Sequence, residues 1–83
     1  MSEITMYGAQ WCGDCTRSKR LLTQLGVDFE YINIEEVAGA ADKVMEINGG
    51  MQSIPVIIFR DGTHLTEPSD KDLRKKLESL ELI

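Results

Sequence analysis

The amino-acid sequence predicts an α/β protein, a three-layer sandwich in which helices cover both faces of a four-stranded mixed sheet. Two observations carry this prediction. Apolar and β-branched runs alternate with segments of helical periodicity in the order β-α-β-α-β-β-α. The pair Asp61-Gly62, typical of a two-residue hairpin turn, joins the last two strands. We expect the first two strands to be parallel, because a helix crosses between them, and the last two to be antiparallel.

The first half of the chain is expected to form a strand, a helix and a second strand. Mixed β-branched, aromatic and apolar residues predict a strand over 3–7. A helix is expected from about Cys12 to Leu25, because its leucines share one face and Gly26 follows them. A run rich in Val, Phe, Tyr and Ile predicts the second strand over 27–34.

The second half adds a helix, a hairpin and a final helix. A helix is expected over about 35–48, where apolar spacing is roughly helical and two glutamates suit the positive end of its dipole. Residues 56–59 predict a short buried strand, and 63–66 the strand that returns from the turn. Ser69 is a natural N-cap for the last helix. The leucines expected on its buried face are Leu73, Leu77 and Leu80.

Length and charge exclude several classes of protein. A chain of 83 residues is expected to form one domain, 1–83. Nine Lys+Arg against fourteen Asp+Glu give a net charge of -5, which disfavours nucleic acid and anionic membranes as partners. No apolar run approaches the roughly 20 residues of a membrane helix, and the N-terminus lacks the features of a signal peptide. We therefore expect a monomer in the cytoplasm.

The only cysteines, Cys12 and Cys15, form one Cys-x-x-Cys motif. A secreted disulfide framework needs more cysteines, and a tetrahedral zinc site needs more ligands than these two and the single histidine, His64, so no metal site is expected. A redox-active dithiol is the main interpretation, because one helical turn brings the two sulfurs together. The alternative is a pair of buried structural thiols.

A Cys-x-x-Cys that opens the first helix of a βαβ pattern is similar to the thioredoxin-like arrangement, and the whole chain resembles glutaredoxins. The likeness rests on Tyr7–Cys15 at the first strand–helix junction and on Ser53-Ile54-Pro55, similar to the family's cis-proline loop. Within the family, Trp11-Cys12, Asn48-Gly49-Gly50 and 61–69 look most like mycoredoxins, which use mycothiol. The resemblance implies the thioredoxin/glutaredoxin fold and a thiol–disulfide oxidoreductase that reduces mixed disulfides on proteins.

Three departures from the family pattern bear on the choice of thiol. Gly13-Asp14 replaces a pair that usually contains an aromatic residue, and Ala9 stands where glutathione-binding glutaredoxins carry a lysine. The extra Gly-Gly step before the last helix is also absent. Glutathione has two carboxylates that need cationic partners, whereas mycothiol is a sugar–inositol thiol without carboxylates. Mycothiol is therefore the expected co-substrate, although Arg17 could still serve one glutathione carboxylate.

The resemblance and the helix position together assign the thiol chemistry. Cys12 is the expected nucleophile, because the backbone N–H groups and the dipole at a helix N-terminus favour a thiolate. Cys15, one turn deeper, is the expected resolving thiol for the mixed disulfide. Electrons are expected from NADPH through a separate reductase. The chain has no nucleotide-binding glycine fingerprint, so we expect no bound cofactor beyond the Cys12–Cys15 disulfide.

Three side chains around the dithiol are further candidates. Asp14 either tunes the redox potential and partner choice or is a solvated first-turn acid. Arg17 either offsets Asp14, helps to bind a substrate anion or belongs to a solvated basic face. Trp11 is expected to shield the sulfurs and offer a flat docking surface, to pack partly into the core, or to do both.

Two loop positions complete the candidate site. The resemblance implies a cis Ile54-Pro55 bond against the disulfide, with the Ile54 backbone free to pair with an extended substrate. The alternative is an ordinary proline entering an edge strand. Ser69 and Asp70, at the start of the last helix, offer N–H and hydroxyl groups to a polar ligand in addition to capping.

Two other functions remain as alternatives. One is a glutaredoxin-like redoxin that is reduced by thioredoxin reductase and serves ribonucleotide reductase. The Trp-Ser-Gly-Phe stretch that such proteins carry near the last helix is absent. The other is an iron–sulfur cluster carrier, in which two subunits and external thiols hold the cluster, and Gly13 after Cys12 is compatible with it.

Overall fold

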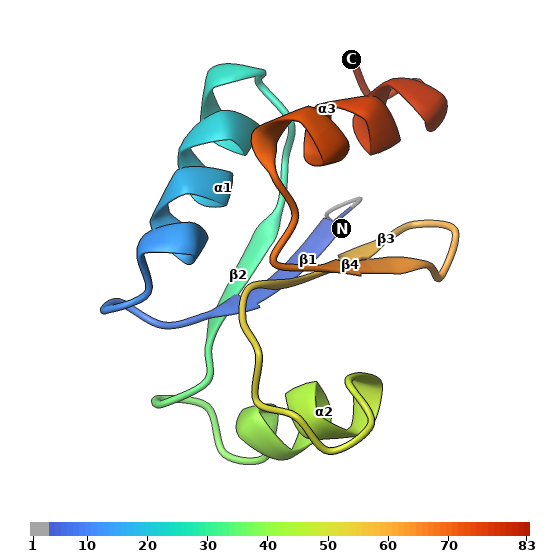
Figure 1. Cartoon of the computed structure of the whole chain (residues 1–83). Helices are drawn as coiled ribbons and strands as arrows, with labels where there is room; N and C mark the ends of the chain where they lie inside the picture. Colours follow the sequence, from blue (N-terminus) through green and yellow to red (C-terminus); the bar gives the residue numbers. More distant parts are fainter. Residues whose placement is uncertain (1–3) are drawn as a thin grey trace.

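The computed structural model describes residues 4–83 and has the predicted order of elements (Figure 1). Glu3, predicted as the start of the first strand, lies outside the described residues. The elements are β1 (Ile4–Gly8), α1 (Gly13–Gln24), β2 (Glu30–Asn33), α2 (Ala40–Ile47), β3 (Val56–Phe59), β4 (His64–Thr66) and α3 (Asp70–Ser79).

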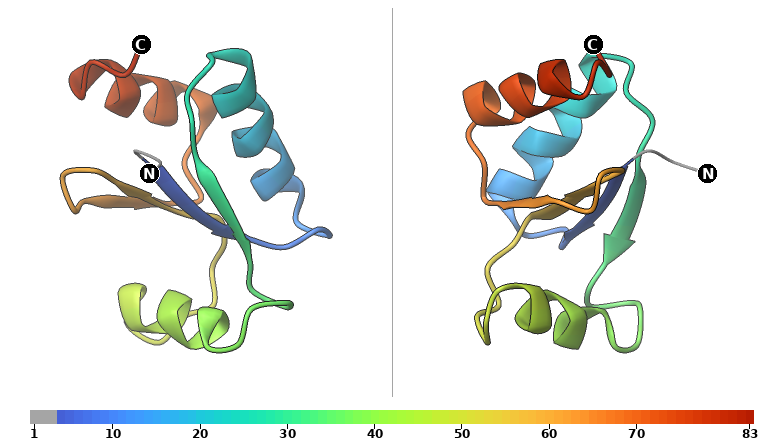
Figure 2. Two further views of the ribbon diagram at one scale, coloured as in Figure 1. Left: turned by 180° about the vertical axis from the view of Figure 1, so that it is seen from behind. Right: turned by 90° about the vertical axis from the view of Figure 1, so that its right-hand side faces the viewer.

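The four strands form one mixed sheet in the order β2-β1-β3-β4. β1 and β2 are parallel and β3 and β4 are antiparallel, as the sequence predicts. β3 is also antiparallel to β1, a pairing for which the sequence gives no prediction. Helices α1 and α3 cover one face of the sheet and α2 covers the other (Figures 1 and 2). The three-layer fold is therefore confirmed. In the part of the chain from Ile4 onward, no helix is long and apolar enough to cross a membrane.

The core lies on both faces of the central strands. Val56 and Ile57 are neighbours in β3 and are both fully buried, because each faces a different helical layer. On α1, Leu22 is fully buried. On α3, Leu73 and Leu77 are fully buried and Leu80 partly, in agreement with the predicted apolar face of that helix.

The predicted helix over 35–48 is wrong in its first turn, since α2 spans only Ala40–Ile47. Gly39 has a φ of 82°, a left-handed conformation that interrupts a right-handed helix. Before it, the oxygen atoms of Asn33 accept hydrogen bonds from the following backbone N–H groups, including that of Glu35 at 2.9 Å. These turns leave Val37 48% exposed rather than on the buried face of a helix.

The second strand is also shorter than predicted, because β2 covers 30–33 instead of 27–34. Val27 belongs to the end of α1, where its N–H donates to the Leu22 carbonyl at 3.0 Å. Gly26 lies between them with a φ of 71°, the left-handed residue that typically ends a helix. The chain becomes extended only after this cap.

The hairpin is confirmed, but its predicted two-residue turn is wrong. Phe59 pairs with Thr63, which leaves the three-residue loop 60–62 between them. Gly62 has a φ of 87°, and its N–H donates to the Phe59 carbonyl at 3.0 Å. A three-residue loop with a left-handed last residue is the next most common hairpin geometry, so the Asp-Gly pair indicates the turn but not its length.

Candidate active site

The two cysteines lie where β1 leads into α1. Cys12 is the N-cap of α1 rather than a residue of its first turn, with extended backbone angles. Its Sγ accepts a hydrogen bond from the Cys15 N–H at 3.2 Å, so the sulfur closes the first turn. Cys12 is 8% exposed and Cys15 is 1% exposed. As predicted, Cys15 is the more recessed of the two thiols.

Cys15 occupies a tight site behind Cys12. A Cβ atom placed on Gly8 would lie 2.9 Å from the Cys15 Sγ and 3.2 Å from the Tyr31 ring. The bare backbone of Gly8 therefore makes the room that the sulfur fills. Burial, followed by the hydrogen bond with Cys12, raises the pKa of the Cys15 thiol to about 12. Cys15 is thus held as a neutral thiol at physiological pH.

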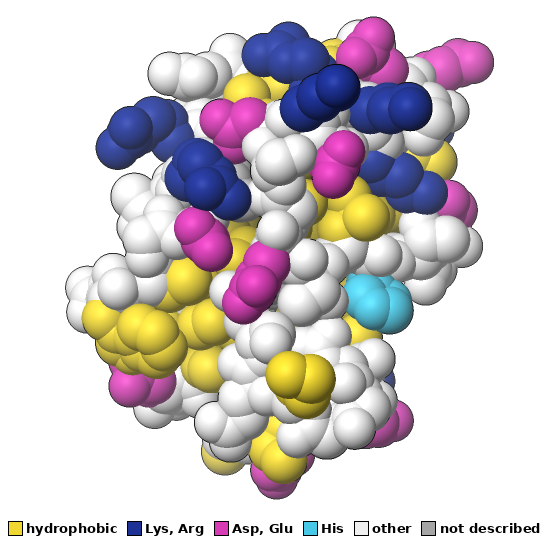
Figure 3. Space-filling model, viewed as in Figure 1, with side chains coloured by type: hydrophobic (Ala, Val, Ile, Leu, Met, Phe, Trp, Pro, Cys, Tyr) yellow, Lys and Arg dark blue, Asp and Glu magenta, His cyan; other side chains and the backbone are white. Residues whose placement is uncertain are grey.

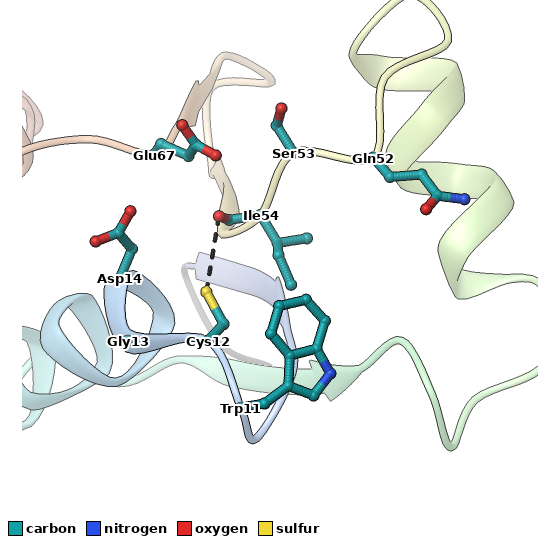
Figure 4. A pocket seen from close by; sticks show the side chains of 8 residues that line it. All are labelled: Trp11, Cys12, Gly13, Asp14, Gln52, Ser53, Ile54 and Glu67. Atoms are coloured by element: carbon teal, nitrogen blue, oxygen red, sulfur yellow. Dashed lines mark hydrogen bonds between the residues drawn. The ribbon is translucent and has the colours of Figure 1, made fainter.

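The loop before β3 forms the opposite wall of the site. The Ile54-Pro55 peptide bond is cis, as the sequence predicts. The Cys12 thiol lies 3.8 Å from the Ile54 carbonyl oxygen and donates to it (Figure 4). On its other side, Pro55 accepts the Glu67 N–H at 2.9 Å. The loop is therefore fixed between the reactive sulfur and the residue that follows β4.

Asn48, just after α2, holds the same loop with its side-chain amide. The amide donates to the Ser53 carbonyl at 2.9 Å and accepts the Thr66 hydroxyl at 2.8 Å. One side chain thus connects α2, the loop and β4. Asn48 enters the sequence analysis only as part of a family likeness, and its contacts give it a positioning role.

A groove of about 380 Å³ opens above the Cys12 sulfur. The Trp11 ring and the Ile54 side chain lie on one side of the sulfur, and the Asp14 and Glu67 carboxylates lie on the other (Figure 4). Trp11 is 70% exposed, so it offers a flat surface to a substrate rather than packing into the core. The lining residues are Trp11, Cys12, Gly13, Asp14, Gln52, Ser53, Ile54 and Glu67.

The sequence analysis missed two of the lining residues, Gln52 and Glu67. Gln52 is two residues before the predicted Ile54-Pro55 pair, and this proximity is the one signal that could have indicated it. Glu67 follows β4 and has a left-handed φ of 50°, and the sequence marks it only as part of the 61–69 segment that resembles mycoredoxins. Only the folded chain brings this carboxylate beside Cys12.

Arg17 lies outside the groove and binds two carboxylates. It pairs with Asp14 at 3.2 Å and with Asp70 at 3.5 Å, and it donates to the Pro68 carbonyl at 3.1 Å. The predicted offset of the Asp14 charge by Arg17 is therefore present. The side chain also connects the first turn of α1 to the start of α3.

Ser69 caps α3 as predicted, because its hydroxyl accepts the Asp72 N–H at 3.1 Å. Neither Ser69 nor Asp70 lines the groove, and their predicted ligand contacts stay predictions. His64 is exposed on β4. Across residues 4–83, no three His, Cys, Asp or Glu side chains come together as a metal site, so the cluster-carrier alternative would depend on Cys12 and external thiols.

The groove is negatively charged. Both charged residues that line it are carboxylates, Asp14 and Glu67, and both are exposed. Ala9, where the family resemblance implies a lysine in members that bind glutathione, is 1% exposed and contributes no cation. The view in Figure 3 shows magenta carboxylates close to the yellow hydrophobic surface on this face of the molecule. The groove can therefore present a thiol to a neutral or cationic substrate.

Comparison with known proteins identifies the family. The family model described as glutaredoxin matches residues 4–65, from β1 into β4. The chain belongs to the glutaredoxin family. Membership implies thiol–disulfide oxidoreductase activity, with the Cys12–Cys15 pair at the candidate active site.

Two relatives of this glutaredoxin are similar over most of their length. A candidate glutaredoxin of Mycobacterium tuberculosis is 38% identical over 74 residues, which cover 89% of this chain and 88% of that protein. Mycoredoxin 1 of Corynebacterium glutamicum is 32% identical over 81 residues, or 96% of this chain and 99% of that protein. The expected likeness to mycoredoxins is confirmed by this match.

The fold is shared with other branches of the family. The crystal structure of a glutaredoxin from Archaeoglobus fulgidus has a TM-score of 0.77 and 34% identity, covering 90% of this chain and 85% of that one. Escherichia coli NrdH is 36% identical over 58 residues, or 70% of this chain and 69% of that protein. A structure of NrdH-redoxin has a TM-score of 0.73 and 29% identity, covering 87% and 91% of the two chains.

Proposed function

We propose that this glutaredoxin removes mycothiol from mixed disulfides on proteins. The observation that supports this is the charge of the groove at Cys12, whose two charged lining residues are carboxylates. Glutathione would bring two carboxylates toward Asp14 and Glu67, and Ala9 supplies no lysine to receive them. Mycothiol carries no carboxylate and can bind through hydroxyl and amide groups.

The reaction has two balanced steps. The Cys12 thiolate attacks the mycothiol sulfur, the disulfide bond to the protein breaks, and the departing protein thiolate takes up a proton. A second mycothiol thiolate then attacks the Cys12 adduct, which returns the Cys12 thiolate and releases mycothiol disulfide. The two electrons thus pass from mycothiol to the protein disulfide. In a second route, Cys15 attacks the Cys12 adduct, so that mycothiol leaves and the Cys12–Cys15 disulfide forms.

The remaining expectations follow from this chemistry. A separate NADPH-dependent reductase regenerates mycothiol from its disulfide. The reaction needs a reducing compartment, and the cytoplasm provides one. The protein acts as a monomer, and its partners are the small thiol and proteins that carry it.

Trapping the adduct tests the choice of thiol. The variant Cys15→Ser is offered mycothiol disulfide and glutathione disulfide together in equal amounts, and its intact mass is measured. We expect the mass of a mycothiol adduct, and none in a matched Cys12→Ser variant. A predominant glutathione adduct would contradict the proposal and indicate a glutaredoxin that uses glutathione.

A second candidate function rests on the likeness to NrdH. That protein matches with 36% identity, and the solved NrdH-redoxin is described as having a thioredoxin-like activity profile. On this alternative, thioredoxin reductase reduces the Cys12–Cys15 disulfide, and the dithiol serves ribonucleotide reductase. Consumption of NADPH in a mixture of this chain, thioredoxin reductase and a disulfide substrate would favour it, provided that Cys15→Ser abolishes the signal.

A further inference from the structure

We infer that Glu67 is a specificity-determining residue that makes the groove select disulfides with a cationic group next to the sulfur, in particular protein cysteines flanked by Lys or Arg. The inference rests on the proposed function, because it concerns the same groove and the same attack by Cys12. It adds the class of protein substrate, which the identity of the small thiol leaves open.

The position of Glu67 is fixed by its backbone. Its φ of 50° lies in the left-handed region that residues other than glycine rarely adopt. Its N–H donates to the Pro55 carbonyl at 2.9 Å, which ties it to the loop opposite Cys12. These contacts hold the Glu67 backbone at the groove, and its carboxylate lies on the same side of the sulfur as that of Asp14 (Figure 4).

The nearby cation does not cancel this charge. Arg17 is shared between Asp14 and Asp70, at 3.2 and 3.5 Å, so these three side chains together keep one negative charge. Within residues 4–83, no ion pair or hydrogen bond engages the Glu67 carboxylate. The edge of the groove therefore keeps the full negative charge of Glu67 and part of that of Asp14 beside the sulfur.

The other side of the groove suits a peptide. The exposed Trp11 ring and the Ile54 side chain offer an apolar surface to a backbone laid along the loop. A peptide centred on its modified cysteine would place one flank against this surface and the other against Asp14 and Glu67. Lysine or arginine on the second flank complements the carboxylates, whereas glutamate is repelled.

Three peptides test the inference. Each has one cysteine, flanked by lysine, glutamine or glutamate, and joined to 2-mercaptoethanol as a mixed disulfide. The pre-reduced protein is mixed in molar excess with each peptide, so that each protein molecule reacts at most once. The released peptide thiol is measured after an acid quench. Each rate is divided by the rate of the same peptide with dithiothreitol, which removes the effect of the flanking charge on the disulfide itself.

For the wild-type protein we expect the order lysine, glutamine, glutamate. The lysine and glutamate peptides should differ by about tenfold at low salt, since each close charge pair in water changes a rate a few fold. At about 1 M salt, where the Debye length is only about 3 Å, the ratio should approach one. In Glu67→Gln the ratio should fall by about threefold, and in Glu67→Lys the order should reverse.

The matched control is Glu78→Gln, which removes the same charge from an exposed residue on the last turn of α3 and should keep the wild-type ratio. Equal normalised rates for the three peptides, or a ratio that is the same in wild type and Glu67→Gln, would overturn the inference and leave the proposed function intact. Failure to reduce any of the three would overturn the inference alone, because the proposed function is decided separately by the adduct that Cys15→Ser forms with mycothiol disulfide.

Discussion

At the scale of single residues, the two thiols differ by their surroundings rather than by their chemistry. Cys15 is 1% exposed, and burial is the main cause that raises its pKa to about 12. Cys12 lines the groove and lies in the path of a substrate. A resolving thiol in this state reacts with a partner that is already attached to Cys12 and is shielded from small molecules in solution.

Alkylation with iodoacetamide at pH 8 measures this difference. In Cys15→Ser the remaining Cys12 should react at least about 100-fold faster than Cys15 does in Cys12→Ser, because a buried, protonated thiol is a poor nucleophile. The comparison uses the native fold, and both thiols should react at similar rates in urea. Equal rates in the native proteins would contradict the assignment of roles.

Gly8 is the second residue on which the dithiol depends. Gly8→Ala would place a Cβ atom 2.9 Å from the Cys15 sulfur, and relief of this overlap should lower the free energy of unfolding by about 1–3 kcal/mol. Urea denaturation of the reduced protein measures the change. Gly13→Ala is the matched control, because a Cβ there meets no atom within 4 Å. The same loss in both variants would show that the overlap is not the cause.

At the scale of elements, the hairpin is held by a carboxylate in its loop. Asp61 accepts hydrogen bonds from the Thr63 N–H at 3.0 Å and the Thr63 hydroxyl at 2.6 Å, and it pairs with Lys76 of α3 at 3.3 Å. The hydrogen bonds to Thr63, and then the contact with Lys76, lower the pKa of Asp61 to about 2. The loop between β3 and β4 is therefore fastened to α3.

The sign of the pH dependence follows from that shift. Because the pKa of Asp61 is lower in the folded state than its ordinary value of 3.8, its contribution to stability is complete above about pH 4 and is lost as the pH falls through about 2. The melting temperature of Asp61→Ala should lie below that of wild type at pH 7, and the gap should close toward pH 2. Asp61→Asn keeps an acceptor for Thr63 without titrating, and should narrow the gap at pH 7. A gap that is constant with pH would refute this account.

At the scale of the whole molecule, the order of the elements could be predicted from the sequence because each has a local period. The β3 segment 56–59 and the cap Ser69 have the predicted positions, since an apolar run and a capping side chain act within a few residues. The start of α2 could not be predicted in the same way. There the hydrogen bonds to Asn33 and the left-handed Gly39 compete with a helical pattern that extends to Glu35.

Within the candidate site, too, local motifs could be predicted from the sequence and contacts between distant segments could not. Cys12, Cys15 and the cis Ile54-Pro55 bond belong to contiguous motifs, and the sequence indicates them. Glu67 and the clamp made by Asn48 depend on contacts between segments far apart in the chain. The acidic edge of the groove is therefore a property of the fold, and no local pattern predicts it.

The cap at the start of α1 has a practical consequence for the choice of an inactive protein. Because the Cys12 sulfur accepts the Cys15 N–H, replacing it removes a helix cap as well as a nucleophile. Serine is among the best N-cap residues, whereas alanine at such a position costs about 0.5–2 kcal/mol. Cys12→Ser therefore removes the nucleophile and keeps a helix cap. Cys12→Ala would remove both, so that a loss of activity could also come from fraying of α1.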